Sequence, residues 1–313
     1  MGTLFVLVSA TMVAPDSTRM IGMSIGARQE KVEPPLNMVP DKFADSGISG
    51  RKRVMAYIDG FNVYYGLKNA SRDADRLHVR NGGAVKDCLG RSLYWLDMQR
   101  VILDLLVADE QCVGIKYFSA PRKVPKRCPI RNKQRLIESN ARQMTYFDAL
   151  RTLPLIELRL GWYSEKSPYT CEACQHQTPR WEEKTTDVGI ATSMVVDAYE
   201  DRFDTALVLS ADADLVPPVQ AVQARGREVI VAVFPGRTRA DRLLALVKIK
   251  RVIEIADLRN RVLPEAIDRP GLRPLECPPH WRHQPDWAWD EADRPTAPDR
   301  PSPTDPSDAN GTT

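Results

Sequence analysis

Acidic side chains follow two apolar runs of this sequence at the point where each run ends. Asp59 comes directly after residues 54–58, Asp212 and Asp214 come after a second run, and Asp187 lies at the start of a predicted helix. Carboxylates packed together repel one another, so one stays protonated unless a cation lies between them. Oxygen donors with little His or Cys favour Mg²⁺ or Mn²⁺. Such a cation can deprotonate water and stabilise the charge that develops on a phosphoryl oxygen.

Helix capping is the alternative explanation for these aspartates. Asp187 and Asp214 stand where an N-cap residue would, and a cap alone contributes roughly 1 kcal/mol. Each aspartate taken singly is better explained as a cap. Taken together, at the ends of two different strands, they favour a metal site, in which Asn62 orients the water or binds the metal through its amide oxygen.

Short apolar runs alternate with helical patterns through the body of the chain, and these elements must position the aspartates. Continuous apolar runs predict strands at 54–58, 113–118, 155–162, 205–210, 228–233 and 251–255. Helical apolar spacing predicts helices at 96–107, 130–150, 187–200, 215–224 and 239–247. This alternation predicts an α/β fold with a mainly parallel sheet covered on both faces. In such sheets function lies at the carboxyl ends of strands, beside the point where strand order reverses.

Several motifs that occur in order resemble the NYN-domain family, the PIN-like, LabA-type nucleases. The first is DGFNVYYGLK at residues 59–68. The others are YWLD at 94–97, EEKTTDVGIA at 182–191, LSADADL at 209–215, ARGREV at 224–229 and CPPHW at 277–281. The resemblance extends from about residue 53 to about residue 282, and motifs that keep their order are more specific than any one of them.

This resemblance implies a Rossmann-like three-layer α/β/α PIN-like fold and divalent-metal-dependent RNA cleavage. It places the catalytic site on four carboxylates, which would also be the metal ligands, and a neighbouring amide: Asp59, Asp187, Asp212, Asp214 and Asn62. Two positions depart from the family pattern. Gly189 stands where the family usually has Asn, and Ala211 where it often has Gly or Asn. Neither departure removes a carboxylate, so only the fine positioning of the site is affected.

The formal net charge of +3 is the sum of unlike segments. Residues 51–263 hold 35 basic and 26 acidic side chains, net +9, whereas residues 1–50 sum to −1 and residues 264–313 to −5. A basic body favours polyanions as partners. Together with the resemblance, this predicts RNA, single-stranded or structured, as the partner. The oligomeric state stays open, a homodimer included.

A basic stretch between two predicted elements is the main candidate for RNA contact. Its seven basic side chains, with no acid among them, are Arg122, Lys123, Lys126, Arg127, Arg131, Lys133 and Arg135. Tyr117 and Phe118 precede the stretch and could stack bases while it grips phosphates. The alternative is a solvated loop and helix face. A second candidate rim follows the fifth predicted strand and consists of Arg237, Arg239 and Arg242.

Tyr64 and Tyr65 follow the first predicted strand and could also stack a base. At helical spacing one of the two is expected to pack into the sheet. Only the other can then be a site residue, and we take it to be Tyr65.

Among the six cysteines only Cys171 and Cys174 have the spacing of metal ligands. A structural zinc needs four ligands. His176 is the candidate third and Cys128 a distant fourth, and the alternative is a pair of reduced loop thiols. The six cysteines form no disulfide framework, which suits a reducing cytoplasm.

The two ends of the chain differ from its body. Residues 1–50 lack periodicity, and we expect a disordered extension or one added by an over-called start codon; their apolar run, 3–14, lacks the basic segment of a signal peptide. Residues 51–263 form the expected nuclease domain, and 264–282 a segment docked on it. Residues 283–313, rich in Pro and Asp, are expected to be disordered. No apolar run is long enough to span a membrane.

The sequence therefore predicts a cytoplasmic, metal-dependent RNA endonuclease, a hydrolase of phosphodiester bonds. The alternative is a non-catalytic RNA-binding or regulatory protein that keeps the NYN fold. A phosphatase with Asp59 as nucleophile is disfavoured, because the segment after Asp59 lacks a second aspartate two residues later that would serve as the acid.

Overall fold

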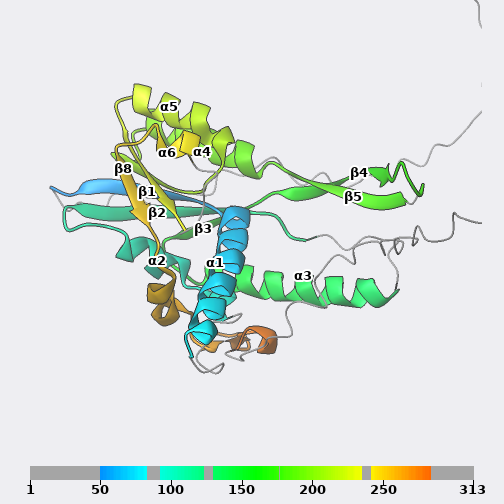
Figure 1. Ribbon diagram of the computed structural model, residues 1–313. Helices are drawn as coiled ribbons and strands as arrows, with labels where there is room; N and C mark the ends of the chain where they lie inside the picture. The colour runs from blue at the N-terminus through cyan, green and yellow to red at the C-terminus, as the bar shows by residue number, and fades with distance from the viewer. Residues whose placement is uncertain (1–49, 83–91, 123–129, 176, 235–240, 283–313) are drawn as a thin grey trace, which may run out of the picture. The chain divides into compact units, whose positions relative to one another are not determined.

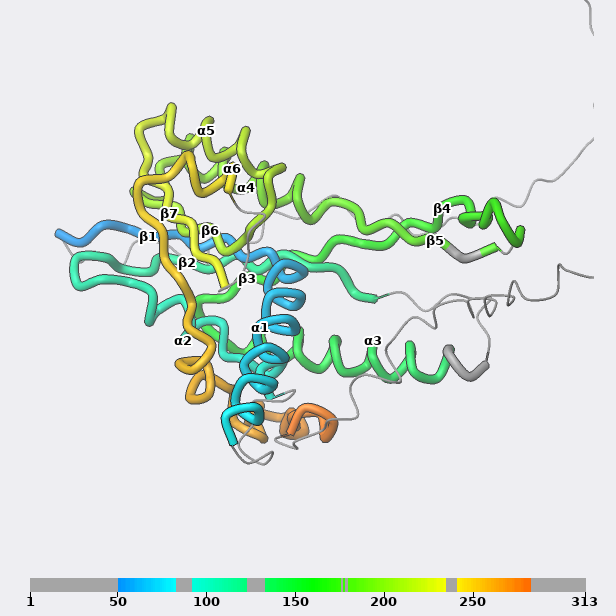
Figure 2. The backbone as a smooth tube through the Cα atoms, in the orientation of Figure 1, coloured from blue at the N-terminus to red at the C-terminus, as the bar shows by residue number. Residues whose placement is uncertain are grey.

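A six-stranded, all-parallel sheet forms the centre of the fold (Figures 1 and 2). The computed structural model describes residues 50–82, 92–122, 130–175, 177–234 and 241–282. The predicted N-terminal extension and the Pro/Asp-rich tail lie outside these residues. Among the helices described, none has the length and hydropathy to cross a bilayer.

The strand order confirms the predicted doubly wound sheet. The strands are β1 (Lys52–Asp59), β2 (Glu110–Ser119), β3 (Ile156–Leu160), β6 (Thr205–Leu209), β7 (Glu228–Val233) and β8 (Ile249–Val252). They are arranged in the order β3-β2-β1-β6-β7-β8, and every neighbouring pair is parallel. The chain builds outward from β1 in one direction and then, from β6, in the other. The strand order therefore reverses between β1 and β6, which is where such sheets bind their ligands.

Helices cover both faces of the sheet because the strands are apolar on both sides. Along β1, Val54, Ala56 and Ile58 belong to one core cluster, and Met55 and Tyr57 to the other. The first cluster packs under α1 (Gly60–Arg80), α2 (Met98–Asp104) and α3 (Ile130–Arg151). The second packs under α4 (Thr186–Tyr199), α5 (Val216–Ala224) and α6 (Asp241–Leu244). This arrangement confirms the three-layer α/β/α fold.

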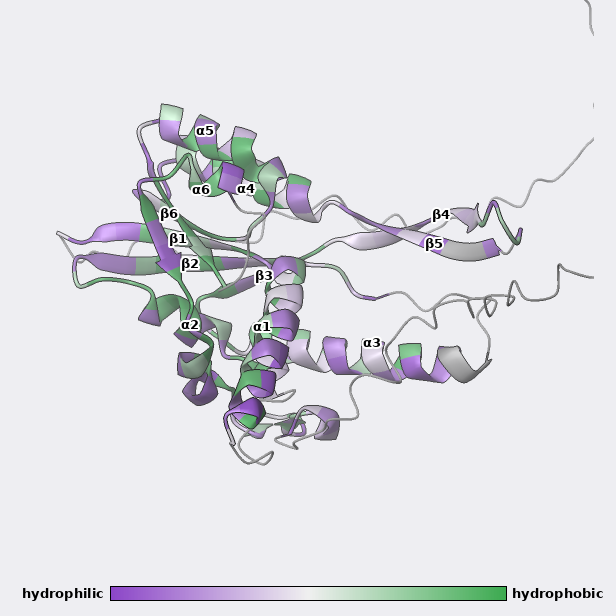
Figure 3. Cartoon of the chain, in the orientation of Figure 1, coloured by the Kyte–Doolittle hydropathy of each residue, from purple (hydrophilic) through white to green (hydrophobic). Residues whose placement is uncertain are grey.

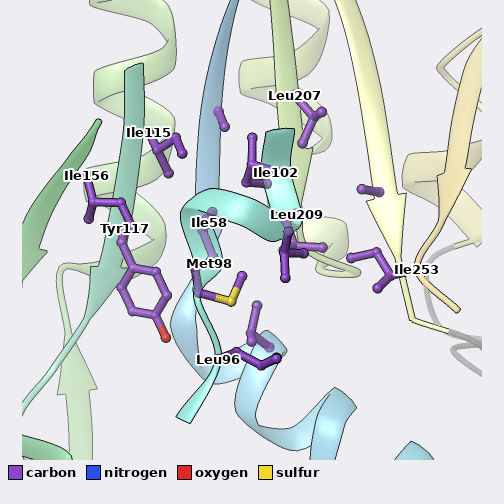
Figure 4. Close-up of a cluster of buried hydrophobic side chains, with 14 of the residues drawn as sticks. Ile58, Leu96, Met98, Ile102, Ile115, Tyr117, Ile156, Leu207, Leu209 and Ile253 are labelled. Carbon is purple, nitrogen blue, oxygen red and sulfur yellow. The ribbon is translucent and has the colours of Figure 1, made fainter. Parts of the chain in front are cut away.

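The first cluster shows how the layers interlock. Figure 4 places Ile58, Leu207 and Leu209 of adjacent strands next to Met98 and Ile102 of α2, all of them buried. Hydrophobic residues are concentrated in the central strands, while hydrophilic residues alternate with them along α1 and α3 (Figure 3). Burial of these aliphatic side chains, at roughly 1.5–3 kcal/mol each, is the main force that holds the sheet and helices together.

The sequence prediction missed several elements, and the two largest parts that it missed are α1 and a β-hairpin. The first is α1, whose 21 residues follow β1 without a loop. The second is the hairpin of β4 (Trp162–Thr170) and β5 (Gln177–Lys184), which projects beyond β3 (Figure 1). The strand β4 is largely exposed and polar, and β5 is polar and mostly half-buried where its side chains are described, so neither has the apolar run that marks a buried strand. The predicted strand 155–162 is in fact β3 and the start of β4.

Gly161 is the residue that makes this junction. A Cβ atom at this position would lie 2.5 Å from the carbonyl oxygen of Lys184. The close approach of β5 to the β3–β4 junction therefore requires glycine. The predicted strand 251–255 is shifted in the structure to Ile249–Val252, and the predicted helices 96–107 and 239–247 are shorter, as α2 and α6.

The segment after β8 lies against the domain. Trp281 packs with Trp95 and Tyr146, at ring-centroid distances of 6.4 and 6.3 Å, beside the buried Leu275 and Cys277. The indole of Trp95 donates a hydrogen bond to the Pro264 carbonyl at 2.9 Å.

A buried ion pair joins α4 to the sheet. Lys116 of β2 and Asp197 of α4 are 2% and 1% exposed, and the ammonium lies 2.8 and 2.6 Å from the two carboxylate oxygens. Tyr57 of β1 donates its hydroxyl to Asp197 at 2.6 Å, and burial followed by the charge of Asp197 raises the pKa of Tyr57. These contacts hold α4 against β1 and β2, on the sheet face that Tyr57 occupies.

Removal of one partner of this pair should be strongly destabilising. We expect Lys116→Met to lower the free energy of unfolding by about 3–5 kcal/mol, because it leaves the buried Asp197 with only the longer contact to Arg202, at 3.5 Å, as a counter-charge. Addition of Asp197→Asn should restore part of that loss. The control is Arg151→Met, which breaks the exposed pair with Asp148 and should change stability by less than about 1 kcal/mol. Urea unfolding measures all three, and equal losses from the two Met variants would contradict the assignment.

Candidate active site

Asp59 ends β1 and begins α1. It is 3% exposed, and as the N-cap of α1 its Oδ1 accepts the backbone N–H of Asn62 at 2.9 Å. Its Oδ2 accepts the hydroxyl of Ser210 at 3.1 Å. Burial raises the pKa of Asp59 above its ordinary value, and the charge of Asp212 adds to the rise, while the bonds from Asn62 and Ser210 oppose it. The carboxylate is thus held at both oxygens.

Ser210 connects the ends of the two central strands. It follows β6, is buried, and accepts the backbone N–H of Asp212 at 3.1 Å while it donates to Asp59. Sequence reasoning did not select Ser210, although it stands in the same short motif as Asp212 and Asp214. A hydroxyl directly after an apolar run and before two aspartates is the signal that could have identified it.

The capping roles differ from the prediction. Asp212, not Asp214, is the N-cap of its short helix and accepts the N–H of Asp214 at 2.9 Å, and Asp214 is exposed. Asp187 is the second residue of α4. The expected N-cap positions of Asp187 and Asp214 are therefore wrong. The helix α4 begins at Thr186, one residue earlier than predicted, and α5 begins at Val216, one residue later, after the short 3₁₀ helix Ala213–Leu215 that Asp212 caps.

The start of α4 is strained. Thr185, directly before the helix, has a φ of 81° and makes no side-chain capping bond. A β-branched residue in this left-handed region is a true outlier, and such residues concentrate at functional sites. The capping is supplied by Glu183 instead, whose Oε1 accepts the backbone N–H of Thr186 at 3.0 Å and also the Thr186 hydroxyl. This arrangement places a further carboxylate beside Asp187.

The predicted carboxylates lie within electrostatic range of Asp187. Its pKa is raised to about 6, first by burial and then by the negative charges of Asp59, Asp212, Glu183 and Asp214, in that order. Asp59 ends β1, Asp212 and Asp214 follow β6, and Asp187 lies in the first turn of α4. Asn62 bonds to Asp59 through both its backbone and its side chain, so it lies in the same group.

The donor chemistry of this group, hereafter the acidic site, suits a hard divalent cation. Its ligating atoms are carboxylate, amide and hydroxyl oxygens, which Mg²⁺ and Mn²⁺ prefer. Burial, and after it the charges of neighbouring carboxylates, raises the pKa of Asp59 and of Asp187, and a bound cation would favour their charged forms. Within the described residues, however, no three His, Cys, Asp or Glu side chains converge closely enough to hold an ion. Binding would need Asp187 and Asp212 to rotate toward Asp59, whose two oxygens are held by Asn62 and Ser210.

A small pocket opens beside the acidic site. It lies at the carboxyl ends of β1, β6 and β7, and its lining includes Asn62, Ser210, Ala211 and Phe234. The pocket thus coincides with the point of strand-order reversal that the fold predicts for a ligand.

The expected RNA-binding residues fall into three groups. Arg122 is exposed at the end of β2, where its backbone N–H donates to Gln143 at 2.7 Å. Lys123, Lys126, Arg127, Arg237 and Arg239 lie outside the described residues, as does the side chain of Arg131. Tyr117 and Phe118 are buried in the sheet, so the expectation that they stack bases is wrong.

Tyr64 and Tyr65 also differ from the prediction. They are 40% and 54% exposed, so neither packs into the sheet. Because α1 begins at Gly60, Val63 and Leu67 are the residues that face the core. Both tyrosines are therefore open to a ligand.

The cysteine pair lies at the tip of the β4–β5 hairpin. Hydrogen bonds from Cys174 and Ala173 lower the pKa of the Cys171 thiol, and the backbone N–H of Gln175 donates to the Cys171 carbonyl at 2.8 Å. His176 and Cys128 lie outside the described residues. Zinc at this turn stays a prediction.

Residues 53–250 match the family model described as NYN domain. A curated protein of Pseudomonas putida (strain DSM 28022 / S16), 6-hydroxy-3-succinoylpyridine 3-monooxygenase HspA, is 28% identical over 271 residues, with 75% of this chain and 77% of that protein covered. A solved structure of a protein of unknown function from Vibrio parahaemolyticus has a TM-score of 0.38 and 17% identity, with 69% of this chain and 99% of that one covered.

Because the pKa of Asp187 is raised, replacing its carboxylate by a neutral amide should increase the stability of the protein at neutral pH. The folded state keeps a proton that the unfolded chain has already released, so this group's contribution to stability is complete below about pH 4 and is lost as the pH rises through about 6. Asp187→Asn is therefore expected to raise the free energy of unfolding at pH 7.5 in EDTA, and to change it little at pH 4. Since the side chain is only half-buried, we expect a gain of about 1 kcal/mol.

Urea unfolding at the two pH values measures this difference. The matched control is Asp257→Asn, a change at an exposed aspartate in the last part of the domain. A loss of stability in Asp187→Asn at pH 7.5 would show that its carboxylate is not repelled by its neighbours.

Proposed function

Because the chain belongs to the NYN-domain family, we propose that it is a divalent-metal-dependent ribonuclease that hydrolyses RNA phosphodiester bonds. The observation that carries this proposal is the position of four aspartates beside the point of strand-order reversal: Asp59 ends β1, Asp212 and Asp214 follow β6, and Asp187 lies in the first turn of α4. After burial, the charges of the other three contribute to the raised pKa of Asp187. A protein that only bound RNA would gain nothing from concentrating negative charge in the path of phosphates. A hydrolase that uses a cation needs this charge.

Asp59, Asp187 and Asp212 would hold the cation, with Asp214 at the exposed rim. When bound, Mg²⁺ or Mn²⁺ would lower the pKa of water and offset the negative charge of the phosphodiester. Asn62 and Ser210 hold the two oxygens of Asp59, so its carboxylate is fixed before substrate arrives. Such fixed polar groups need no rearrangement during the reaction, which is the main source of electrostatic catalysis.

The positions of the surrounding groups support RNA as the substrate. Arg122 lies at the end of β2, close enough for its charge to act on Tyr163 at the start of β4. The basic body of the chain, net +9 over residues 51–263, would attract the phosphate backbone toward the acidic site. We also propose a cytoplasmic location, since the cysteines in the described part of the chain, Cys112, Cys171, Cys174 and Cys277, are all free thiols.

Loss of one carboxylate should abolish most cleavage. We expect Asp212→Asn to reduce the rate of RNA cleavage in Mn²⁺ by at least about 100-fold, because a preorganised charge is lost from the reaction centre. Asp257→Asn should retain the wild-type rate, and EDTA should stop cleavage by both. The assay follows labelled unstructured and structured RNA on denaturing gels. Equal cleavage by wild type and Asp212→Asn would exclude this mechanism.

Binding of RNA without cleavage by the wild-type protein in any divalent cation would favour the alternative function. In that case the chain is a non-catalytic RNA-binding or regulatory protein that keeps the NYN fold. The aspartates would then act as caps, as Asp59 and Asp212 already do.

A second candidate function comes from the Pseudomonas putida relative, which is named as a 6-hydroxy-3-succinoylpyridine 3-monooxygenase. Its alignment covers 77% of that protein, so the two chains share most of their length. A monooxygenase of this kind would consume oxygen and a reduced cofactor together with the pyridine. Incubation with 6-hydroxy-3-succinoylpyridine, oxygen and reduced nicotinamide or flavin tests it. Turnover of the pyridine that survives Asp212→Asn, without RNA cleavage, would favour this candidate over the nuclease.

A further inference from the structure

Six aromatic side chains follow one another from the acidic site along α1. Phe61 and Tyr163 meet edge to face at a centroid distance of 6.2 Å, Tyr64 lies 5.2 Å from both Tyr65 and Tyr94, and Tyr94 lies 5.9 Å from Trp281. Tyr65 in turn lies close enough to Tyr163 to raise its pKa, after burial. These residues, hereafter the aromatic row, are Phe61, Tyr64, Tyr65, Tyr94, Tyr163 and Trp281.

The row begins at the acidic site. Phe61 is two residues from Asp59, in the first turn of α1. Tyr163 is paired in the β4–β5 ladder with Glu183, whose charge also raises the pKa of Asp187. A ligand that lay along the row would therefore have one end at the carboxylates.

The rings of the row are partly exposed to solvent, and other side chains of α1 already face the core. Tyr64 and Tyr65 are 40% and 54% exposed, and Phe61, Tyr94, Tyr163 and Trp281 are all half-buried. The core-facing side of α1 is already supplied by Val63 and Leu67. A continuous set of partly exposed large rings on a protein surface marks an interaction site.

Positive charge accompanies the row. Lys68 and Arg72 lie one and two helical turns beyond Tyr64 on α1, Arg122 acts on Tyr163, and Arg282 follows Trp281. Aromatic rings beside basic side chains are the means by which proteins bind single strands, because each base offers a face for stacking and each phosphate a charge. Paired bases are already stacked inside a helix and cannot offer their faces.

We propose that the aromatic row binds unpaired RNA by base stacking and delivers it to the acidic site, so that the substrate is single-stranded. The proposal takes the identity of the nucleic acid from the proposed function. It extends Tyr65, the expected stacking residue that the structure leaves exposed, to six rings on four separate elements. Trp281 is among them, so residues 264–282 form part of the binding surface.

The test measures RNA binding by the full chain in EDTA, where no metal-dependent cleavage occurs. Fluorescence anisotropy compares a labelled 12-nucleotide oligouridine with a labelled duplex of the same length at low, fixed salt. We expect the single strand to bind at least tenfold more tightly than the duplex. Tyr64→Ala and Tyr65→Ala should each weaken single-strand binding at least fivefold, since one stacked base contributes about 1–3 kcal/mol.

Two matched variants keep the test specific. Tyr65→Phe keeps the ring and should retain wild-type affinity. Tyr199→Ala removes an equally exposed tyrosine at the far end of α4 and should also bind as wild type does. Thermal melting checks that each variant is folded, which is expected because the two substituted side chains lie largely in solvent.

Three results would overturn the proposal: equal affinity for single strand and duplex, wild-type binding by both Ala variants, or no measurable RNA binding. A change of oligomeric state in the Ala variants would identify a second copy of the chain as the occupant and also overturn it. The outcome is separable from the nuclease assay. Selective single-strand binding without cleavage would support the aromatic row as an RNA-binding surface and reject the nuclease proposal. Cleavage that is unaffected by the Ala variants would support the nuclease and reject the role of the row.

Discussion

Repulsion among carboxylates at one end of a parallel sheet is the constraint on which the rest of this structure depends. Asp59 is buried and Asp187 is half-buried, and the pKa of each is raised, first by burial and then by the charges of neighbouring carboxylates. Isolated charges in such a place are strongly unfavourable, so most proteins avoid them. A fold that keeps them must offset the repulsion by packing elsewhere, and a site that keeps them is suited to a cation.

The remainder of the fold is arranged to hold these groups in place. The order of the strands brings the end of β1 beside the end of β6, and Ser210 joins the two by hydrogen bonds. The third carboxylate comes from α4, which the buried contact between Lys116 and Asp197 fixes to the sheet. The position of Asp187 at the carboxyl edge therefore depends on an ion pair in the interior of the domain. The strain at Thr185 and the capping bonds of Glu183 complete the positioning of that helix start.

Much of the fold and of the acidic site could be predicted from the sequence because both depend on short patterns of neighbouring residues. Continuous apolar runs such as residues 54–58 mark buried parallel strands, and aspartates directly after them must lie at the carboxyl edge. The β4–β5 hairpin could not be found this way, since exposed strands such as Trp162–Thr170 have no apolar run.

Other misses have a different physical origin. The exposure of Tyr64 and Tyr65 depends on where α1 begins, and a shift of one residue in the start of a helix changes which side chains face the core. Tyr117 and Phe118 lie within the predicted strand 113–118, and they are buried because β2 is an inner strand between β3 and β1 with helices on both faces of the sheet. The aromatic row joins residues from 61 to 281, and contacts over that separation leave no local signal.

The most direct test of the central claim is to locate a bound cation. Crystals of the wild-type chain grown at pH 7.5 with Mn²⁺ would be measured near the manganese absorption edge, and an anomalous difference map would be computed. We predict a peak between the carboxylates of Asp59, Asp187 and Asp212, with the side chains rotated toward it. A map without a peak there, from protein that cleaves RNA under the same conditions, would contradict the assignment of this acidic group as the metal site.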